Sequence, residues 1–426
     1  MNRKQLFPIL LIVFTNILGA GVIIPILPLY AEGQFQGSVI QITLLSSVFF
    51  GAQFIAAPVL GRLSDRHGRR PVLIVSQMGT VLAFILFILA RPLGQQIDQL
   101  GLGLPMTGGM VMLFIARILD GITGGNITTA QAYVSDITDD QNRAQGLGYL
   151  QAAFGVGFIF GPAFGGLLSR INVVAPFIGA TIITAGTLML TIFTLKESLT
   201  PEKREISGVS GQQRTQGKIN IFSFPALPLI LLIGFVASLA FSALPAIFSL
   251  YANDVIFQGA AQSSVYIGLM LAFNGMFQVI TQISLLRPLI QKFGERRVLV
   301  IGQVSLIVGF LGIAGVTNAI LVTAFFAPFA FGSGLSNPSI QSLVTRFQSV
   351  AKSGTLLGFY QSARSLALIL GPIWAGYAYQ AISPRAVFII GGIIMMVALV
   401  FSTILLRMQI PAKKPAASAE PNRPTG

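Results

Sequence analysis

Long apolar runs, separated by short polar segments, recur along the whole chain. Each run has about 20 residues, the length an α-helix needs to cross the hydrocarbon core of a bilayer. A helix satisfies its own backbone hydrogen bonds inside lipid, so the pattern predicts an all-α membrane protein. Twelve membrane spans are expected: 6–29, 40–60, 72–91, 110–133, 146–168, 175–195, 224–249, 264–286, 298–316, 319–343, 355–379 and 386–406.

Charge is scarce and clustered, with 54% of residues hydrophobic and 9% charged, against about 25% charged in a soluble domain. The N-terminus, the even-numbered loops and the C-terminal tail together hold 22 of the 27 Lys and Arg residues. The odd-numbered loops hold three of them, Arg91, Arg170 and Arg385. Because basic loops stay on the cytoplasmic side, both termini are expected in the cytoplasm.

The same inventory excludes several function classes. The net charge of +14 lies in short loops and forms no continuous patch, so no nucleic-acid partner is expected. No cysteine is present, and His67 is the only histidine, so no metal or other cofactor is expected. One buried acid without His or Cys is a poor catalytic constellation, so the chain is not expected to be an enzyme.

Two segments repeat. GRLSDRHGRRPVL (61–73) aligns with 287–299 at an offset of 226, and 148–166 aligns with 358–376 at an offset of 210. Five of 13 and seven of 19 positions are identical. This predicts two pseudo-symmetric six-helix bundles, the architecture of transporters with a central site. The expected division is an N-terminal bundle (1–195), a cytoplasmic linker (196–223), a C-terminal bundle (224–406) and a disordered tail (407–426).

The loop after the second span resembles motif A of the major facilitator superfamily, which implies ion pairs that latch the cytoplasmic side. Asp65 lies there among arginines and can also face a helix N-terminus. The second copy has Gln291 in the place of Asp65, which predicts a weaker latch. The matching residues are Gly61, Asp65, Arg66, Gly68, Arg69 and Arg70.

The fifth span, with the stretch GVGFIFGPAFGG, resembles motif C of the drug:proton antiporters of that superfamily. Gly157, Gly161 and Gly165 recur every four residues, so they share one face on which another helix can approach closely. Pro162 removes a backbone hydrogen bond and introduces a kink. The matching residues are Gly148, Gly157, Gly161, Pro162, Gly165 and Gly166.

The fourth span resembles motif B, whose arginine is Arg117. Asp120 lies one turn away and is the one acid clearly within a span. Pairing with Arg117 lowers the cost of an ionised acid in lipid, and breaking the pair favours protonation. Asp120 is therefore a candidate proton carrier, with a static ion pair as the alternative. Asp136 and Arg143 match the next loop of the tetracycline-efflux branch, where the resemblance implies a gating role.

A substrate cavity between the halves is expected from polar and aromatic residues of facing spans. Two buried arginines outnumber one buried acid, which favours a zwitterion or weak acid with an apolar body over a purely cationic compound. The candidate cavity residues are Gln151, Phe241, Asn274, Gln278, Tyr360, Gln361 and Arg364.

The motifs together predict a proton-coupled exporter of small amphipathic compounds, tetracycline-like or multidrug, that works by alternating access. The resemblance implies a bacterial plasma (inner) membrane protein whose partners are a small-molecule substrate, protons and the lipid bilayer. A monomer can contain the whole pathway. Two alternatives stay open. One is a transporter of an endogenous metabolite, in either direction, and the other is a non-transporting membrane sensor or scaffold.

Overall fold

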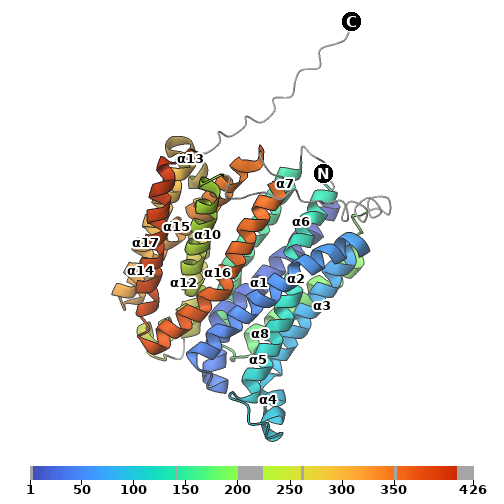
Figure 1. The fold of residues 1–426 in the computed structure, drawn as a ribbon. Helices are drawn as coiled ribbons and strands as arrows, with labels where there is room; N and C mark the ends of the chain where they lie inside the picture. The colour runs from blue at the N-terminus through green and yellow to red at the C-terminus, as the bar shows by residue number, and fades with distance from the viewer. Residues whose placement is uncertain (1–2, 140–141, 200–223, 261–262, 350–352, 410–426) are drawn as a thin grey trace.

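The computed structural model describes residues 3–139, 142–199, 224–260, 263–349 and 353–409. Every regular element within these ranges is helical (Figure 1). Eleven helical segments are long and apolar enough to cross a membrane by length and composition. A further helix, α16 (Ser353–Ala381), is 29 residues long and lies among them. Eleven of the twelve predicted spans are thus apolar helices of spanning length, and α16 occupies the position of the remaining one. Most of the predicted linker and tail lies outside the described residues.

The first six spanning helices form an N-terminal set, in which α1 packs against α7 and α8, and α3 packs against α5 and α8. Their bounds are α1 (Arg3–Phe35), α2 (Val39–His67), α3 (Arg69–Ile88), α5 (Gly108–Gly124) with α6 (Ile127–Asp136), α7 (Arg143–Leu168) and α8 (Ala175–Thr194).

The other six form a C-terminal set, in which α14 packs against α15 and α17, and α10 packs against α16 and α17. Their bounds are α10 (Ala226–Phe241) with α11 (Ala243–Tyr251) and the π-helix η2 (Ala252–Ile256), α12 (Ser263–Ile280) with the π-helix η3 (Thr281–Leu285) and α13 (Leu286–Phe293), α14 (Glu295–Gly315), α15 (Ala319–Thr345) with the 3₁₀-helix η4 (Arg346–Ser349), α16, and α17 (Ala386–Arg407).

Three elements differ from the sequence prediction. Helix α2 continues through His67, so most of the expected loop after the second span is helical. The fourth span is broken between α5 and α6, at Gly125 and Asn126. A short helix, α4 (Ala90–Gln99), lies between α3 and α5, where a plain loop was expected. Its Leu93 and Ile97 pack on the hydrophobic core, which holds this polar decapeptide against the bundle.

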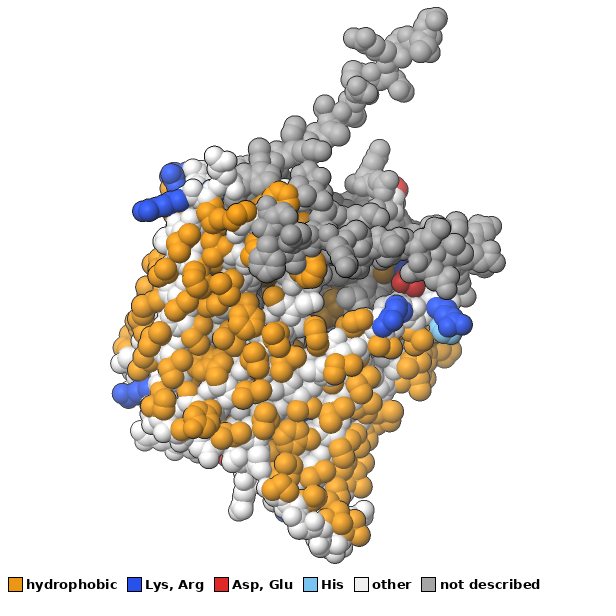
Figure 2. Space-filling view, viewed as in Figure 1, with side chains coloured by type: hydrophobic (Ala, Val, Ile, Leu, Met, Phe, Trp, Pro, Cys, Tyr) orange, Lys and Arg blue, Asp and Glu red, His pale blue; other side chains and the backbone are white. Residues whose placement is uncertain are grey.

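The two sets meet along α7 with α12 and along α2 with α16. We call the face at which α2, α13 and α17 end the basic face, because Arg62, Arg66, Arg287 and Lys292 lie there; α4 lies on the opposite face (Figure 1). Hydrophobic side chains cover most of the lateral surface between the two faces, as expected for contact with lipid (Figure 2).

The closest approaches between the two sets include two that lie toward the opposite face. Toward the opposite face, a Cβ atom added at Gly376 of α16 would overlap the Thr43 hydroxyl of α2, and one at Gly268 of α12 would lie 3.1 Å from the Gly166 Cα of α7. Near the basic face, a Cβ atom on Gly148 would find no atom within 4 Å. Gly148 is therefore not part of a close contact between helices.

Candidate functional site

A buried ion pair lies on α5. Arg117 Nη1 donates to Asp120 Oδ2 at 3.1 Å, and the two side chains are 7% and 10% exposed. Helix α2 supplies two further partners for the arginine. Arg117 Nε donates to the Leu45 carbonyl at 3.3 Å, and the guanidinium lies 4.1 Å from the centre of the Phe49 ring. The expected pairing is present, and a neighbouring helix holds the arginine from two sides.

The absence of a side chain at Gly121 brings α2 within reach of Arg117. A Cβ atom there would lie 2.5 Å from the Phe49 carbonyl oxygen and 2.8 Å from Ala52 Cβ, so only glycine allows this approach. The polar face of α5 is therefore buried against α2. Sequence reasoning gave no role to Leu45 or Phe49, because a backbone carbonyl and one of 33 phenylalanines carry no distinguishing pattern.

Side chains of neighbouring helices form hydrogen bonds with residues at the break between α5 and α6. Gln53 Nε2 on α2 donates to the Gly124 carbonyl at 2.9 Å. Asn16 Nδ2 on α1 donates to Asn126 Oδ1 at 3.2 Å. A discontinuous spanning helix keeps free backbone groups only where side chains, water or a ligand satisfy them. The hydrogen bonds at the break thus tie α1, α2 and the end of α5 together, C-terminal to the ion pair.

The motif A residues form a second cluster, on the basic face. Arg69, at the start of α3, donates to Asp65 of α2 and, at 3.2 Å, to Asp136 of α6. The turn between α2 and α3 needs Gly68, whose φ is 105°, a region that L side chains avoid. Gly61 lies within helix α2 and faces open space, so it is not part of this turn.

The remaining predicted residues of this face are not part of that cluster. Arg66 is exposed near the end of α2. Arg70 Nη2 donates to the Ile192 carbonyl of α8 at 2.7 Å. The side chain of Arg143 lies outside the described part of the chain.

Glu197, and not Asp65, occupies the N-terminus of α3. Its two carboxylate oxygens accept the backbone N–H groups of Arg69 at 2.9 Å and Arg70 at 3.1 Å. A carboxylate at this position satisfies orphan N–H groups and complements the helix dipole. The sequence analysis assigned Glu197 to the linker. Glu197 lies 128 positions after Arg69, and no local pattern shows that it caps α3.

The C-terminal set has its own ion pair on the same face. Arg346 Nε donates to Glu295 Oε2 at 2.8 Å, and Ser342 donates to the other oxygen at 2.8 Å. At the repeat offsets of 226 and 210, Glu295 corresponds to Arg69 and Arg346 to Asp136. The two halves therefore keep the same ion pair with the charges exchanged, which the count of identical residues did not predict.

The motif C helix packs on two partners. Cβ atoms on Gly157, Gly161 and Gly165 would lie 2.8, 2.7 and 3.1 Å from backbone atoms of α1, so these glycines share one face as expected. Gly166 meets α12 instead, where a Cβ atom would lie 2.9 Å from the Ser264 carbonyl oxygen. Gly148 is exposed and takes no part in close packing. Pro162 lies inside an unbroken helix.

The predicted cavity residues divide into two groups. Gln151 and Gln361 are exposed, while Gln278 and Arg364 are half-buried. The others are packed within the C-terminal set. Asn274 is 3% exposed and Tyr360 is 1% exposed, and Phe241 stacks on Phe329 with ring centres 5.7 Å apart.

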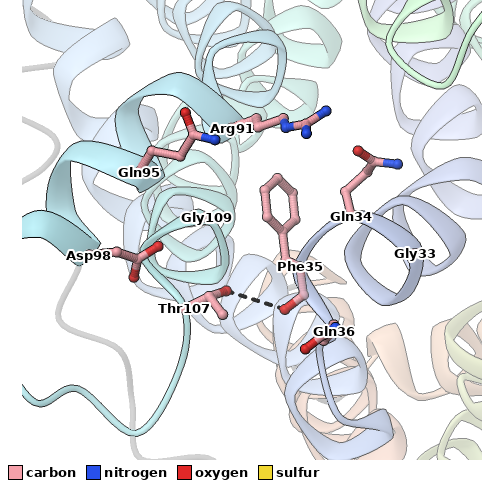
Figure 3. Close-up of a pocket in the computed structure, with 9 residues that line it drawn as sticks. All are labelled: Gly33, Gln34, Phe35, Gln36, Arg91, Gln95, Asp98, Thr107 and Gly109. Atoms are coloured by element: carbon pink, nitrogen blue, oxygen red, sulfur yellow. Dashed lines mark hydrogen bonds between the residues drawn. The ribbon is translucent and has the colours of Figure 1, made fainter.

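A separate pocket of about 270 Å³ lies on the opposite face, between the end of α1, α4 and the start of α5 (Figure 3). Thr107 Oγ1 donates to the Phe35 carbonyl at 3.3 Å at its base, and the Arg91 side chain extends along its rim. Asp98 Oδ1 accepts the Gly108 N–H at 2.6 Å and so caps α5. The pocket belongs to the N-terminal set alone and does not include Arg117 or Asp120.

Comparison with known proteins agrees with this architecture. The family model of the Major Facilitator Superfamily matches residues 9–283 and 230–425. The class C tetracycline resistance protein of Escherichia coli is 29% identical over 387 residues, which cover 89% of this chain and 91% of that protein. Multidrug resistance protein 2 of Bacillus subtilis (strain 168) is 28% identical over 408 residues, which cover 93% of this chain and 94% of that protein. The solved structure of the nucleoside transporter NupG has a TM-score of 0.75 at 13% identity, over 95% of this chain and 100% of that one.

Proposed function

Because the chain belongs to the major facilitator superfamily, we propose that it is a proton-coupled exporter of small amphipathic compounds. The tetracycline and multidrug resistance proteins among its relatives support drug-like cargo, since they match about nine-tenths of the chain. The motif C helix supports the antiporter assignment, because its glycines pack on α1 of one set and on α12 of the other.

The observation that carries the proposal is the Arg117–Asp120 pair inside a spanning helix. A proton on Asp120 removes the negative charge and breaks the ion pair. Arg117 then keeps the Leu45 carbonyl and the Phe49 ring as partners, so it stays bound to α2. The neutral carboxyl is free to move relative to α2, and protonation is thereby coupled to helix packing.

We place the basic face in the cytoplasm, following the distribution of Lys and Arg. Close contacts between the sets on the opposite face support an inward-facing conformation, which would accept cargo from the cytoplasm. Rocking of the two sets about the central site exposes the cargo outside, where protons drive the return. One chain contains all these parts, which supports a functional monomer.

The test uses purified protein in liposomes with an imposed pH gradient. Uptake or release of tetracycline and a panel of lipophilic acids and cations is measured for the wild type and for Asp120→Asn. We expect gradient-driven movement in the wild type. We expect the variant to lose this movement while retaining cargo exchange without a gradient, because the carboxamide fills the same space but carries no proton.

Asp139→Asn is the matched control. Hydrogen bonds from the Asn142 backbone and side chain lower the pKa of the exposed Asp139 carboxyl, so this acid stays ionised at neutral pH and carries no proton. If Asp120→Asn still couples, the pair is structural and the proton site is elsewhere. If the wild type moves no panel compound but exchanges a metabolite, the metabolite transporter replaces the drug exporter.

A further inference from the structure

The interior of the spanning helices holds one cation more than it has acids. Arg117 is paired with Asp120. Arg364, in the middle of α16, has no carboxylate within 4.0 Å among the described residues. An unpaired charge in a spanning helix is costly, and such residues face water-filled cavities or bind charged partners. The position of Arg364 on α16 shows which of these applies.

One stripe of α16 is buried against α10 and α11. A Cβ atom on Gly234 would lie 2.7 Å from the Tyr360 ring, and Ser242 donates to the Ala367 carbonyl at 3.3 Å. Trp374 Nε1 donates to the Leu239 carbonyl at 3.2 Å. These residues recur at helical spacing, so they define the side of α16 that faces its own set.

A second stripe of α16 faces α2 of the other set, where Gly376 meets Thr43. At about 100° per residue, Arg364 falls between this stripe and the one that contains Tyr360. Its side chain is half-buried. Arg364 is therefore directed toward the space between the two sets.

The repeat identifies the residues of α7 that are equivalent to Arg364 and Gln361. At the offset of 210, Arg364 corresponds to Phe154 of α7, which is 36% exposed, and Gln361 corresponds to Gln151. Both glutamines are exposed, one turn nearer the basic face. The two helices thus carry a glutamine at the equivalent position nearer the basic face, and at the next position an aromatic ring on α7 and a cation on α16.

We propose that Arg364 binds the anionic group of an amphipathic cargo whose apolar body packs against Phe154. Weak organic acids and zwitterions with an aromatic body are then the substrate class, and lipophilic cations are excluded by Arg364. This assignment rests on the proposed exporter function and makes its cargo more specific. The charge on the cargo replaces the carboxylate that Arg364 lacks within the protein.

The test compares three probes with the same ring system: 2-naphthoate, the neutral 2-naphthamide and the cationic 2-naphthylmethylamine. Binding of each radiolabelled probe to the full chain in lipid nanodiscs is measured by equilibrium dialysis, with empty nanodiscs as the blank. We expect naphthoate to bind at least 10-fold more tightly than naphthamide, and the amine to bind most weakly. Arg364→Gln should abolish the difference between naphthoate and naphthamide, while Arg364→Lys retains part of it.

Two further variants separate charge from packing. Phe154→Ala should weaken naphthoate and naphthamide by the same factor, because it removes an apolar contact common to both. Arg170→Gln, an exposed arginine on the opposite face, should change neither. The proposal is overturned if the wild-type protein does not bind naphthoate or prefers the amine. It is also overturned if Arg364→Gln weakens binding of naphthoate and of naphthamide by the same factor.

The anion site and the exporter function are tested by separate experiments, so either can be wrong while the other holds. If the charge preference is measured but no pH-gradient-driven movement occurs in liposomes, the anion site stands and the exporter assignment is wrong. If movement is proton-coupled but the transported compounds are cations, the exporter stands and the role of Arg364 is wrong.

Discussion

Gly376 marks the point at which α16 meets α2 on the opposite face, and a single methyl group there is predicted to shift the equilibrium between the two transport states. In Gly376→Ala the new Cβ atom would overlap the Thr43 hydroxyl and lie 3.1 Å from Thr43 Cβ. Thr43 is 0% exposed, and its hydroxyl donates to the Ile40 carbonyl at 3.1 Å. The threonine has no room to turn away, so the two helices must separate.

The magnitude follows from the cost of overpacking a close contact, which is about 1–3 kcal/mol. The overlap exists only while α2 and α16 touch on the opposite face, so the whole cost falls on the inward-facing state. A difference of that size changes the ratio of the two states by about 5- to 150-fold. The variant should therefore populate the outward-facing state.

The assay is pulsed electron paramagnetic resonance on spin labels at Gln151→Cys and Gln361→Cys, which is simplified because the chain contains no cysteine. Both positions are exposed near the basic face, so closure there shortens the distance between the labels. Thr43→Ala removes the overlapping hydroxyl and should restore the wild-type distribution. Gly186→Ala is the control, since a Cβ atom there meets nothing within 4 Å. An unchanged distribution in Gly376→Ala, or no restoration by Thr43→Ala, would refute the reasoning.

Three other predictions concern stability, each measured as the thermal midpoint in detergent. Glu295→Ala should lower the free energy of unfolding by about 2–4 kcal/mol. This loss is somewhat smaller than for a fully buried pair, because the Arg346 side chain is 23% exposed. A double variant that exchanges the two charges should recover most of the lost stability. Gly161→Ala should destabilise by about 1–3 kcal/mol, since the new Cβ atom would lie 2.7 Å from the Gly21 Cα. Glu197→Gln should cost about 1 kcal/mol through the weakened cap of α3, and an unchanged midpoint would contradict that cap.

The membrane fold was predictable because its signals are local. Apolar runs of spanning length gave the helices, and the four-residue spacing of Gly157, Gly161 and Gly165 gave the face that packs on α1. The Arg117–Asp120 pair was also predictable, because residues three apart on a helix lie on the same face. In each case the physical cause acts over one or two helical turns.

The rest of the site depends on contacts between distant segments. Glu197 caps a helix that begins 128 residues earlier, and a polar stretch after a span gives no sign of this. The break in the fourth span was hidden because its apolar pattern continues on both sides, although Gly124, Gly125 and Asn126 lie at that point. Helix α4 was missed because its fold depends on the bundle that Leu93 and Ile97 contact.

The charge-exchanged pair shows why counting identities underestimates a repeat. The sign of the Coulomb attraction is unchanged when the two charges trade places, so Arg69 with Asp136 and Glu295 with Arg346 are both attractive pairs although the residues differ at both positions. Each of these pairs joins segments of one set, and neither crosses between the sets. They fix the shape of each half at the basic face and need not break when the halves move.

The contacts that do cross between the sets are of another kind. Gly166 with Gly268 and Gly376 with Thr43 are close approaches of small residues, and the Ser249 hydroxyl donates a hydrogen bond to the Ile24 carbonyl at 3.2 Å. No ion pair within the described residues crosses between the sets. Such contacts are held by dispersion and shape, so separating them leaves no buried charge without a partner. Strong interactions thus lie where the structure must stay rigid, and weak, tightly packed ones lie where it must open. This division lets two rigid halves rock about a site between them at low cost.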